Sequence, residues 1–272
     1  MSSQSATNHG KKLFDLSGKV ALLSGAASGL GRASALALAG QGAGLLLADL
    51  NAAGLEKTAE EARTHGVKVV TAVADISKPE TATNLFAKVD AEFGRIDFVA
   101  NIAGEGLLVK PEDLTQEQLR GVFQNLVFGR FAMCQEAGRR MVAAGRGSIL
   151  NIGSLASTTA LGRGHIAYSM AMGAVVQMTR ELSTEWACKG VRVNAILPAQ
   201  VMNPSLEKRI AADPAIEKKW LSGIPAGRLG RSEDIQGLVV LLASDASSWI
   251  TGALIPMDGG NLAMNAGGTI GV

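Results

Sequence analysis

Cysteines, aromatic residues and long apolar runs are all scarce in this chain of 272 residues. Its two cysteines, Cys134 and Cys188, are too few and too far apart to form a disulfide framework, so they suit a reducing cytoplasm. No uninterrupted apolar run approaches the roughly 20 residues that cross a bilayer, so we expect no membrane partner. The formal net charge is +2 and the basic residues are dispersed, which predicts no nucleic-acid partner either.

The composition is typical of one globular domain. Apolar residues make up 47% of the chain and charged residues 18%, which is enough to bury a substantial core in an α/β protein. No internal repeat or proline-rich linker divides the sequence. Residues 1–12 are polar and lack the apolar stretch of a secretory signal. We therefore expect a flexible leader at 1–12, a single domain over 13–272 and a cytoplasmic location.

Apolar runs alternate with stretches of helical periodicity, and the connections between them are short. This alternation predicts βαβ units and a parallel sheet with helices on both faces. We expect strands at 19–24, 44–49, 67–73, 96–101, 147–152, 191–197 and 253–257, and helices at 30–41, 52–65, 79–93, 115–143, 165–188 and 232–243. Seven strands in this arrangement predict a single-domain, doubly wound Rossmann fold, which binds ligands at the carboxyl ends of its strands.

Residues 19–49 have the order of a phosphate-binding unit. An apolar run enters the glycine loop Ser24-Gly25-Ala26-Ala27-Ser28-Gly29-Leu30-Gly31, and a helical segment and a second apolar run then lead to Asp49. Glycines allow the backbone to approach a pyrophosphate closely, and a helix that starts near Gly29 directs N–H groups at the phosphates. A carboxylate about twenty residues past the loop accepts hydrogen bonds from a ribose diol and repels the extra phosphate of NADP. Because the loop has no basic residue, and Arg32 is expected on the helix surface, the predicted cofactor is NAD.

Further candidate contacts follow the later strands. Asp75 either hydrogen-bonds an adenine edge, with Ile76 beneath the ring, or caps a turn. After the fourth strand, small residues would let a cofactor lie against the backbone, and Glu105 places a carboxylate near its nicotinamide end. Residues 198–231 begin at Pro198 and hold four of the seven prolines, so they are interpreted as a substrate lid or, alternatively, as a solvated surface excursion.

These features resemble the short-chain dehydrogenase/reductase family, of the NAD-dependent, single-domain kind, from about Gly18 to Gly260. The residues that carry the resemblance are Gly25, Gly29 and Gly31; Asp49; Asp75; Asn101-Ile102-Ala103-Gly104; Asn125; Asn151-Ile152-Gly153-Ser154; Tyr168; Val193-Asn194-Ala195; and Thr251-Gly252 with Asp258-Gly259-Gly260. The resemblance implies hydride transfer between a nicotinamide and a small alcohol or ketone, such as a polyol, a sugar derivative or a hydroxy acid. The predicted cofactor contacts are Gly25, Ser28, Gly29, Leu30, Gly31, Asp49, Leu50, Asp75, Ile76, Asn101, Ala103, Gly104, Tyr168, Pro198 and Val201.

The resemblance also implies the roles of the catalytic residues. Ser154 would hydrogen-bond the substrate oxygen, Tyr168 would exchange its proton, and Asn125 would hold a water in the proton relay. In the family, a lysine four residues after the tyrosine binds the nicotinamide ribose and favours the ionised phenol. Here that position is Met172, which carries no charge and donates no hydrogen bond. Ser157 is an alternative to Ser154.

The missing lysine has a measurable consequence. A free phenol has a pKa of about 10, so only about one in a thousand is ionised at pH 7. A nearby cation that lowered this pKa by ~2–3 units would contribute roughly 3–4 kcal/mol toward the phenolate. Arg163, His165 and Lys110 are the candidates for a replacement, of which Arg163 is best placed. Otherwise Arg163 is a solvated loop charge, His165 begins a helix and Lys110 is a surface residue. Glu105, Ser154, Arg163 and Tyr168 are the predicted substrate contacts.

Three functions follow. The first is an NAD-dependent oxidoreductase, slowed by the loss of the lysine. The second is a non-redox lyase or epimerase on the same scaffold, with Tyr168 as a neutral acid and Glu105 or His165 as the base. The third is an inactive NAD-binding subunit. The resemblance further implies a homodimer or homotetramer, built through the apolar faces of the helices at 115–143 and 165–188.

Overall fold

One sheet of seven parallel strands organises the protein, whose computed structural model describes residues 12–264. The strands are β1 (Val20–Ser24), β2 (Gly44–Asp49), β3 (Val69–Val73), β4 (Phe98–Asn101), β5 (Gly147–Ile152), β6 (Val191–Pro198) and β7 (Leu254–Met257). They lie in the order β3-β2-β1-β4-β5-β6-β7, and every neighbouring pair is parallel. The predicted Rossmann fold is confirmed, and each strand ends within about two residues of its expected bounds.

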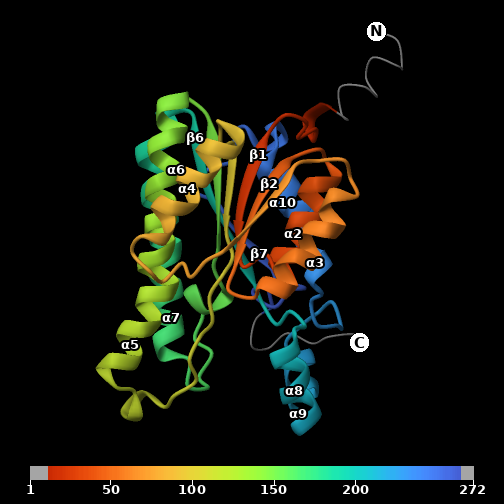
Figure 1. Cartoon of the computed structure of the whole chain (residues 1–272). Helices are drawn as coiled ribbons and strands as arrows, with labels where there is room; N and C mark the ends of the chain where they lie inside the picture. The colour runs from red at the N-terminus through yellow and green to blue at the C-terminus, as the bar shows by residue number, and fades with distance from the viewer. Residues whose placement is uncertain (1–11, 265–272) are drawn as a thin grey trace.

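Helices cover both faces of the sheet, as Figure 1 shows. On one face lie α2 (Gly29–Gly40), α3 (Ala52–Arg63) and α10 (Gln236–Ala243), and on the other lie α4 (Thr81–Phe93), α6 (Arg130–Ala144) and α7 (Ile166–Trp186). Alternate strand residues face alternate layers: Leu23 and Leu45 belong to the first core, whereas Leu22 and Leu46 belong to the second. The inner strands β1, β2, β4, β5 and β6 are mostly apolar because both of their faces are buried, whereas the edge strands β3 and β7 are only partly buried.

The helix expected at 115–143 differs from the prediction. It is divided into α5 (Gln116–Phe123), a π-helical turn (Gln124–Gly129) and α6. The turn lies against the chain that follows β3, where Gln124 Nε2 donates to the Ser77 carbonyl at 2.9 Å. A Cβ on Gly129 would stand 2.2 Å from the Ile76 carbonyl oxygen, so only glycine permits this approach. π turns within helices are frequent at functional sites, and this one contains Asn125.

The chain order reverses between β1 and β4, which are neighbours in the sheet. Ligands of open α/β sheets bind at such a switch point, outside the carboxyl ends of the strands. The segment predicted as a lid contains α8 (Pro204–Ala212) and α9 (Ala215–Leu221), and it has a small apolar cluster of its own around Leu206, Ile224 and Leu229. Apart from Lys12, the predicted leader lies outside the described residues.

Two negative findings apply to residues 12–264. None of their helices is both long and apolar enough to cross a bilayer. Nor do these residues bring together three metal-binding side chains of the His, Cys, Asp or Glu type.

Candidate active site

The glycine loop between β1 and α2 forms a tight cradle. Gly25 and Gly29 have positive φ angles of 72° and 52°, a conformation that favours glycine. A Cβ on Gly31 would stand 1.9 Å from the Gly25 carbonyl oxygen, and one on Gly25 would stand 2.8 Å from the Ala103 nitrogen. Helix α2 begins at Gly29, and no side chain caps its first N–H groups. The loop therefore offers free N–H groups to a phosphate at the positive end of a helix.

Asp49 ends β2 beside this loop. Its carboxylate accepts hydrogen bonds from the backbone nitrogens of Ala27, at 3.0 Å, and Asn51, at 2.9 Å. These two bonds fix its orientation and leave further acceptor positions on both oxygens. Arg32 forms a salt bridge with Glu61 on α3, so its charge is engaged on the helix surface, as expected from the sequence.

A cavity of about 490 Å³ extends from the loop along the carboxyl ends of the strands. The predicted cofactor contacts that line it are Gly25, Ser28, Gly29, Leu30, Gly31, Asp49, Leu50, Asp75, Ile76, Ala103, Gly104 and Val201, together with Glu105 and Asn125. Glycines, backbone N–H groups and the Asp49 carboxylate, whose orientation is fixed, line this cavity. This combination fits a dinucleotide. Asp75 also caps its own turn, because its Oδ1 accepts from the nitrogen and hydroxyl of Ser77, and these bonds hold its pKa below the ordinary value.

Three predicted cofactor contacts lie outside this lining, namely Asn101, Tyr168 and Pro198. Asn101 is buried at the end of β4, where its amide donates to Asn151 Oδ1 at 2.9 Å. That bond joins the ends of β4 and β5, so the side chain has a structural role in the sheet. Pro198 is the last residue of β6.

The two predicted reacting side chains follow β5. Ser154 Oγ accepts from the Ala156 nitrogen at 3.2 Å, so its proton remains free to be donated. Ser157, the alternative, donates its hydroxyl to the Ser154 carbonyl at 2.6 Å and is therefore used within the turn. Tyr168 is half-buried on the first turn of α7. A Cβ on Gly106 would stand 2.7 Å from the Tyr168 ring, so the loop after β4 lies directly on the phenol.

Met172 lies one turn after Tyr168 and is almost completely buried, at 1% exposure. Its neighbours are apolar and include Leu126, Ala171 and Val175. The expected site of the cation is therefore an apolar part of the core.

The three sequence-based replacements for the lysine differ in their surroundings. Lys110 is exposed. Arg163 lies over the Trp220 ring of α9, 5.3 Å from its centroid, and burial lowers its pKa. The His165 ring lies 5.7 Å from the Tyr168 ring, but burial first, and then Arg163 and Arg209, lower its pKa to about 4. His165 is thus neutral at pH 7 and supplies no charge to the phenol.

The sequence reasoning missed a fourth cation, Arg130. It is the first residue of α6 and only 2% exposed, and its guanidinium donates to the carbonyls of Ala103, at 3.1 Å, and Ile152. A signal for it was present in the sequence. Arg130 falls four residues after Leu126 and three before Met133, both fully buried, so an arginine interrupts the apolar stripe of the helix.

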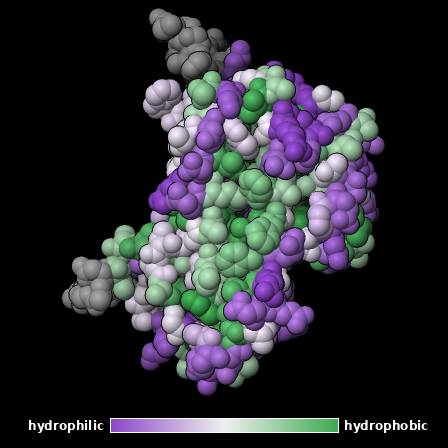
Figure 2. Space-filling model, turned by 90° about the vertical axis from the view of Figure 1, so that its left-hand side faces the viewer, coloured by the Kyte–Doolittle hydropathy of each residue, from purple (hydrophilic) through white to green (hydrophobic). Residues whose placement is uncertain are grey.

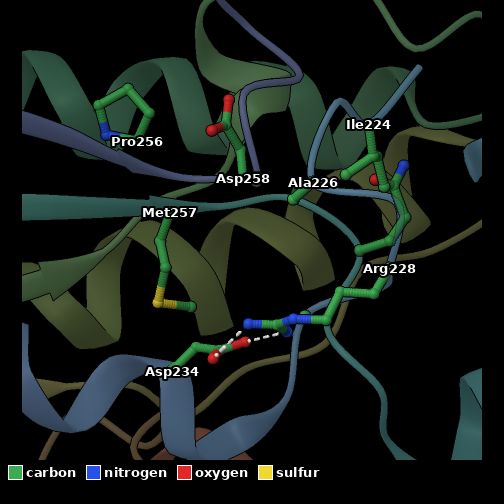
Figure 3. A pocket seen from close by; sticks show the side chains of 11 residues that line it. Ile224, Ala226, Arg228, Asp234, Pro256, Met257 and Asp258 are labelled. Carbon is green, nitrogen blue, oxygen red and sulfur yellow. Dashed lines mark hydrogen bonds and ion pairs between the residues drawn. The ribbon is translucent and has the colours of Figure 1, made fainter. Parts of the chain in front are cut away.

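A second cavity, of about 310 Å³, lies at the carboxyl ends of β6 and β7, beneath the predicted lid. Figure 3 shows Arg228 reaching across it to Asp234, with Pro256 and Met257 on the strand side. The two Arg228 bonds, 2.7 and 2.9 Å long, are the main cause of the lowered pKa of Asp234. This pair ties the end of the lid segment to the turn before α10.

Comparison with known proteins points to dehydrogenases. A family model described as "Enoyl-(Acyl carrier protein) reductase" matches residues 25–261. D-threitol dehydrogenase from Mycolicibacterium smegmatis is 40% identical over 91% of this chain and 94% of its own. NAD-dependent glycerol dehydrogenase from Listeria innocua is 38% identical over 92% of this chain and 96% of its own. The solved gluconate 5-dehydrogenase from Burkholderia cenocepacia, in complex with NADP and tartrate, has a TM-score of 0.88 and 28% identity, covering 94% of this chain and 100% of that one.

Proposed function

The chain belongs to the short-chain dehydrogenase/reductase family and is an oxidoreductase for alcohol or ketone substrates, and from this premise we propose that it is an NAD-dependent dehydrogenase of a polyol, sugar derivative or hydroxy acid. The observation that carries the proposal is the cavity that joins the glycine loop and Asp49 to the loop lying on Tyr168. The cavity fits the cofactor, and Tyr168, which does not line it, lies against the loop that continues from the Glu105 end of the cavity.

Asp49 supports NAD over NADP. Its carboxylate is held by two backbone N–H groups at the cavity wall, and a 2′-phosphate placed there would face a fixed negative charge. The nearest candidate for compensation, Arg32, is paired with Glu61. The glycerol dehydrogenase relative is NAD-dependent, whereas the solved gluconate 5-dehydrogenase holds NADP, so the preference rests on the residues of this chain.

We assign the chemistry to Ser154, Tyr168 and Asn125. When bound, the nicotinamide accepts the hydride that leaves the substrate carbon. Ser154 donates its free hydroxyl proton to the substrate oxygen and holds it in place, and Tyr168 takes the proton that the alcohol loses. Asn125 lines the cofactor cavity, and we assign to it the water that links the phenol to solvent.

The direct test follows NADH absorbance while the purified protein is offered polyols, aldonic acids and other hydroxy acids. We expect turnover of at least one of these, a large loss of kcat in Tyr168→Phe, and tighter binding of NAD than of NADP in calorimetry. Product formation without a change in nicotinamide absorbance would instead indicate the lyase or epimerase alternative, which the relatives do not favour. NAD binding without turnover of any substrate would indicate the inactive subunit.

We further propose a cytoplasmic homotetramer. Both cysteines are free thiols, which is consistent with a reducing compartment. Two separate surfaces expose large apolar side chains. Figure 2 shows an apolar band across the face formed by α4 to α7, and Phe128 and Phe131 are exposed there. Trp249, just before β7, is 99% exposed. In a two-fold symmetric interface, the same patch of each subunit contacts its copy on the partner. One of these surfaces can therefore join two chains into a dimer, and the other can join two dimers into a tetramer.

A further inference from the structure

Arg130 is a buried cation with no acidic partner. Its guanidinium lies between the ends of β4 and β5, where it bonds two neutral carbonyls, and its Nε has no partner among residues 12–264. No carboxylate in this described part of the chain lies within salt-bridge distance of it. A charge that is removed from water without a counter-charge is costly, and such groups concentrate at functional sites.

The charge is retained despite burial. Burial lowers the pKa of Arg130 to about 10, while attraction from Tyr168 acts in the opposite direction, so the guanidinium remains protonated at pH 7. The other ionisable neighbour, Cys134, does not neutralise it, because burial raises the pKa of that thiol to about 12. Tyr168 is therefore the remaining ionisable neighbour whose negative charge this cation can stabilise.

The loop after β4 joins Arg130 to the site. A Cβ on Gly104 would lie 3.5 Å from Arg130 Nη2 and 3.6 Å from Asn125 Oδ1, and two residues later Gly106 lies on the Tyr168 ring. The guanidinium, the relay amide and the phenol therefore border the same three-residue loop. That loop also lines the cofactor cavity through Gly104 and Glu105.

We propose that Arg130 supplies, from the start of α6, the positive charge that α7 lacks at Met172, and that it stabilises the negative charge on Tyr168 Oη when the phenol exchanges its proton. The inference rests on the proposed function. In the oxidative direction, the alcohol O–H proton passes to the phenolate, and the C–H electron pair leaves as hydride to the nicotinamide. The products are a ketone, a neutral tyrosine and a reduced nicotinamide. Arg130 is a positioning residue that acts through Tyr168.

The competing interpretation is that Arg130 only joins β4 to β5 through its two carbonyl bonds. Four variants distinguish the two interpretations: Arg130→Met, Arg130→Lys, Met172→Lys and the double variant Arg130→Met/Met172→Lys, which we call the exchange variant. The exchange moves the cation to the position one helical turn after Tyr168 and keeps the composition of the pocket nearly constant. Met172→Lys alone places a second cation in an apolar cluster, so we expect it to lower the melting temperature without raising activity.

The first readout needs no turnover. Because Tyr168 is the only tyrosine of the chain, the phenolate absorbance in a pH titration reports on this residue alone, with Tyr168→Phe as the blank. We expect the absorbance transition of Arg130→Met to lie at higher pH than that of the wild type, and the exchange variant to reverse the shift. An unchanged transition in folded Arg130→Met overturns the inference.

The second readout is the pH dependence of kcat/KM. We expect Arg130→Met to lower the value about 100-fold near neutrality, a typical loss for impaired acid–base catalysis, and to move the acid limb to higher pH. Arg130→Lys should lower kcat/KM less than Arg130→Met does, and the exchange variant should recover most of the wild-type kcat/KM. A loss that is equal at every pH and is not rescued by Met172→Lys would show a purely structural role. If wild type turns over no substrate while the tyrosine titration shifts as expected, the proposed function fails and the electrostatic inference stands.

A different observation supports a second inference about the substrate. Arg163, from the loop before α7, and Arg209, on α8, both lie against the Trp220 ring, at 5.3 and 5.5 Å from its centroid. No acid within the described residues forms a salt bridge with either arginine, and burial first, then repulsion by Arg209, lower the pKa of Arg163. The buried Nε of Arg163 and both ring nitrogens of His165 also lack partners among these residues. Two cations that have no salt bridge to an acid and one neutral imidazole thus lie next to Tyr168, and the carboxylate that shares a cavity lining with Arg163 and His165, that of Glu112, is exposed to solvent.

We infer that this cluster binds the carboxylate of the substrate, which makes a sugar acid or similar hydroxy acid a better substrate than the neutral polyol of the same length. The inference also rests on the proposed function. An arginine fork binds a carboxylate in two-point geometry, and the Trp220 face holds both guanidinium planes in place. Because Arg209 and Trp220 belong to the predicted lid, the bound acid would also hold α8 and α9 against the loop before α7.

The test compares kcat/KM for an aldonic acid and its parent polyol in wild type, Arg163→Gln and Arg209→Gln. We expect the acid to be preferred at least 10-fold, and each variant to lose about 10-fold on the acid alone, as expected for a hydrogen bond to a charged group. Added salt should lower kcat/KM for the aldonic acid and leave kcat/KM for the polyol unchanged. Equal loss on both substrates, or a wild-type preference for the polyol, overturns the inference. Turnover of neither substrate means that the proposed function fails, and acid binding in calorimetry then still reports on the cluster.

Discussion

Gly31 and Gly25 approach each other so closely that no side chain fits between them. A Cβ on Gly31 would stand 1.9 Å from the Gly25 carbonyl oxygen. The contact holds the first turn of α2 against the end of β1, and this sets the height of the free N–H groups above the sheet.

Gly31→Ala should therefore abolish cofactor binding. The added methyl group clashes with backbone rather than with a movable side chain, so either the loop or the helix must shift. We expect NAD affinity, measured by calorimetry, to fall at least 100-fold with a lower melting temperature. The matched control is Gly121→Ala on α5, where the added carbon meets nothing within 4 Å. That substitution should be neutral or stabilising by up to ~1 kcal/mol. Normal NAD binding by Gly31→Ala would contradict this account of the loop.

Asp49→Asn should relax the choice between the two cofactors. The amide keeps the shape of the carboxylate but loses the charge that opposes a 2′-phosphate, and it offers one acceptor oxygen in place of two. We expect NAD to bind about 10-fold more weakly and NADP more tightly. Asp75→Asn is the control because it removes a second acid from the same cavity. It should affect both cofactors alike. If Asp75→Asn changes the ratio of the affinities as much as Asp49→Asn does, the assignment of Asp49 is wrong.

Ser154 and Ser157 are distinguished by their hydrogen bonds. The Ser154 hydroxyl proton is free, whereas Ser157 donates to the Ser154 carbonyl. Ser154→Ala should lower kcat about 100-fold, as the loss of one donor to a reacting oxygen does, with little change in NAD affinity. Ser157→Ala should cost no more than a few-fold. The reverse order of the two effects would transfer the catalytic role to Ser157.

The pKa of His165 predicts an acid-sensitive stability. In the unfolded chain this histidine has a pKa near 6.5, and in the folded protein burial and the two arginines lower it to about 4. Between these values the unfolded chain binds a proton that the folded protein does not. The free energy of unfolding therefore decreases as the pH falls from 6.5 toward 4, and this contribution is unchanged above 6.5. His165→Gln should flatten that part of the profile in urea titrations, whereas His65→Gln, at an exposed position, should leave it unchanged. A steeper profile in His165→Gln would reverse the sign of this argument.

The sequence could predict those features that depend on neighbouring residues. The inner strands are mostly apolar runs, the glycine loop is a local backbone motif, and Asp49 is the last residue of β2, so the sequence predicts all three. The sequence does not separate Ser154 from Ser157 by their hydrogen bonds, because that difference depends on the direction of the Ser157 hydroxyl in a turn.

Arg130 illustrates what the sequence alone did not reveal. Its importance depends on three separate segments, since the guanidinium from α6 bonds the chain after β4 and the last residue of β5. Helical spacing from Tyr168 indicates residue 172, and chain order indicates the neighbouring loops, but neither indicates a residue on α6. The π-helical turn before Arg130 was missed as well, because it arises from the close approach of Gly129 to the loop after β3 and not from helix propensity.

The two exposed apolar surfaces predict separable steps of assembly. Phe128 is 55% exposed beside α6, and Trp249 is 99% exposed before β7, so a monomer in water would leave both rings unburied. We expect the wild type to be a tetramer in light scattering coupled to gel filtration. Phe128→Glu and Trp249→Glu should each give dimers, because each places a charge in only one of the two interfaces, and the double variant should be monomeric. Lys57→Glu, which changes the charge of exposed α3 surface, should remain tetrameric. A wild-type monomer at micromolar concentration would mean that these rings serve another partner.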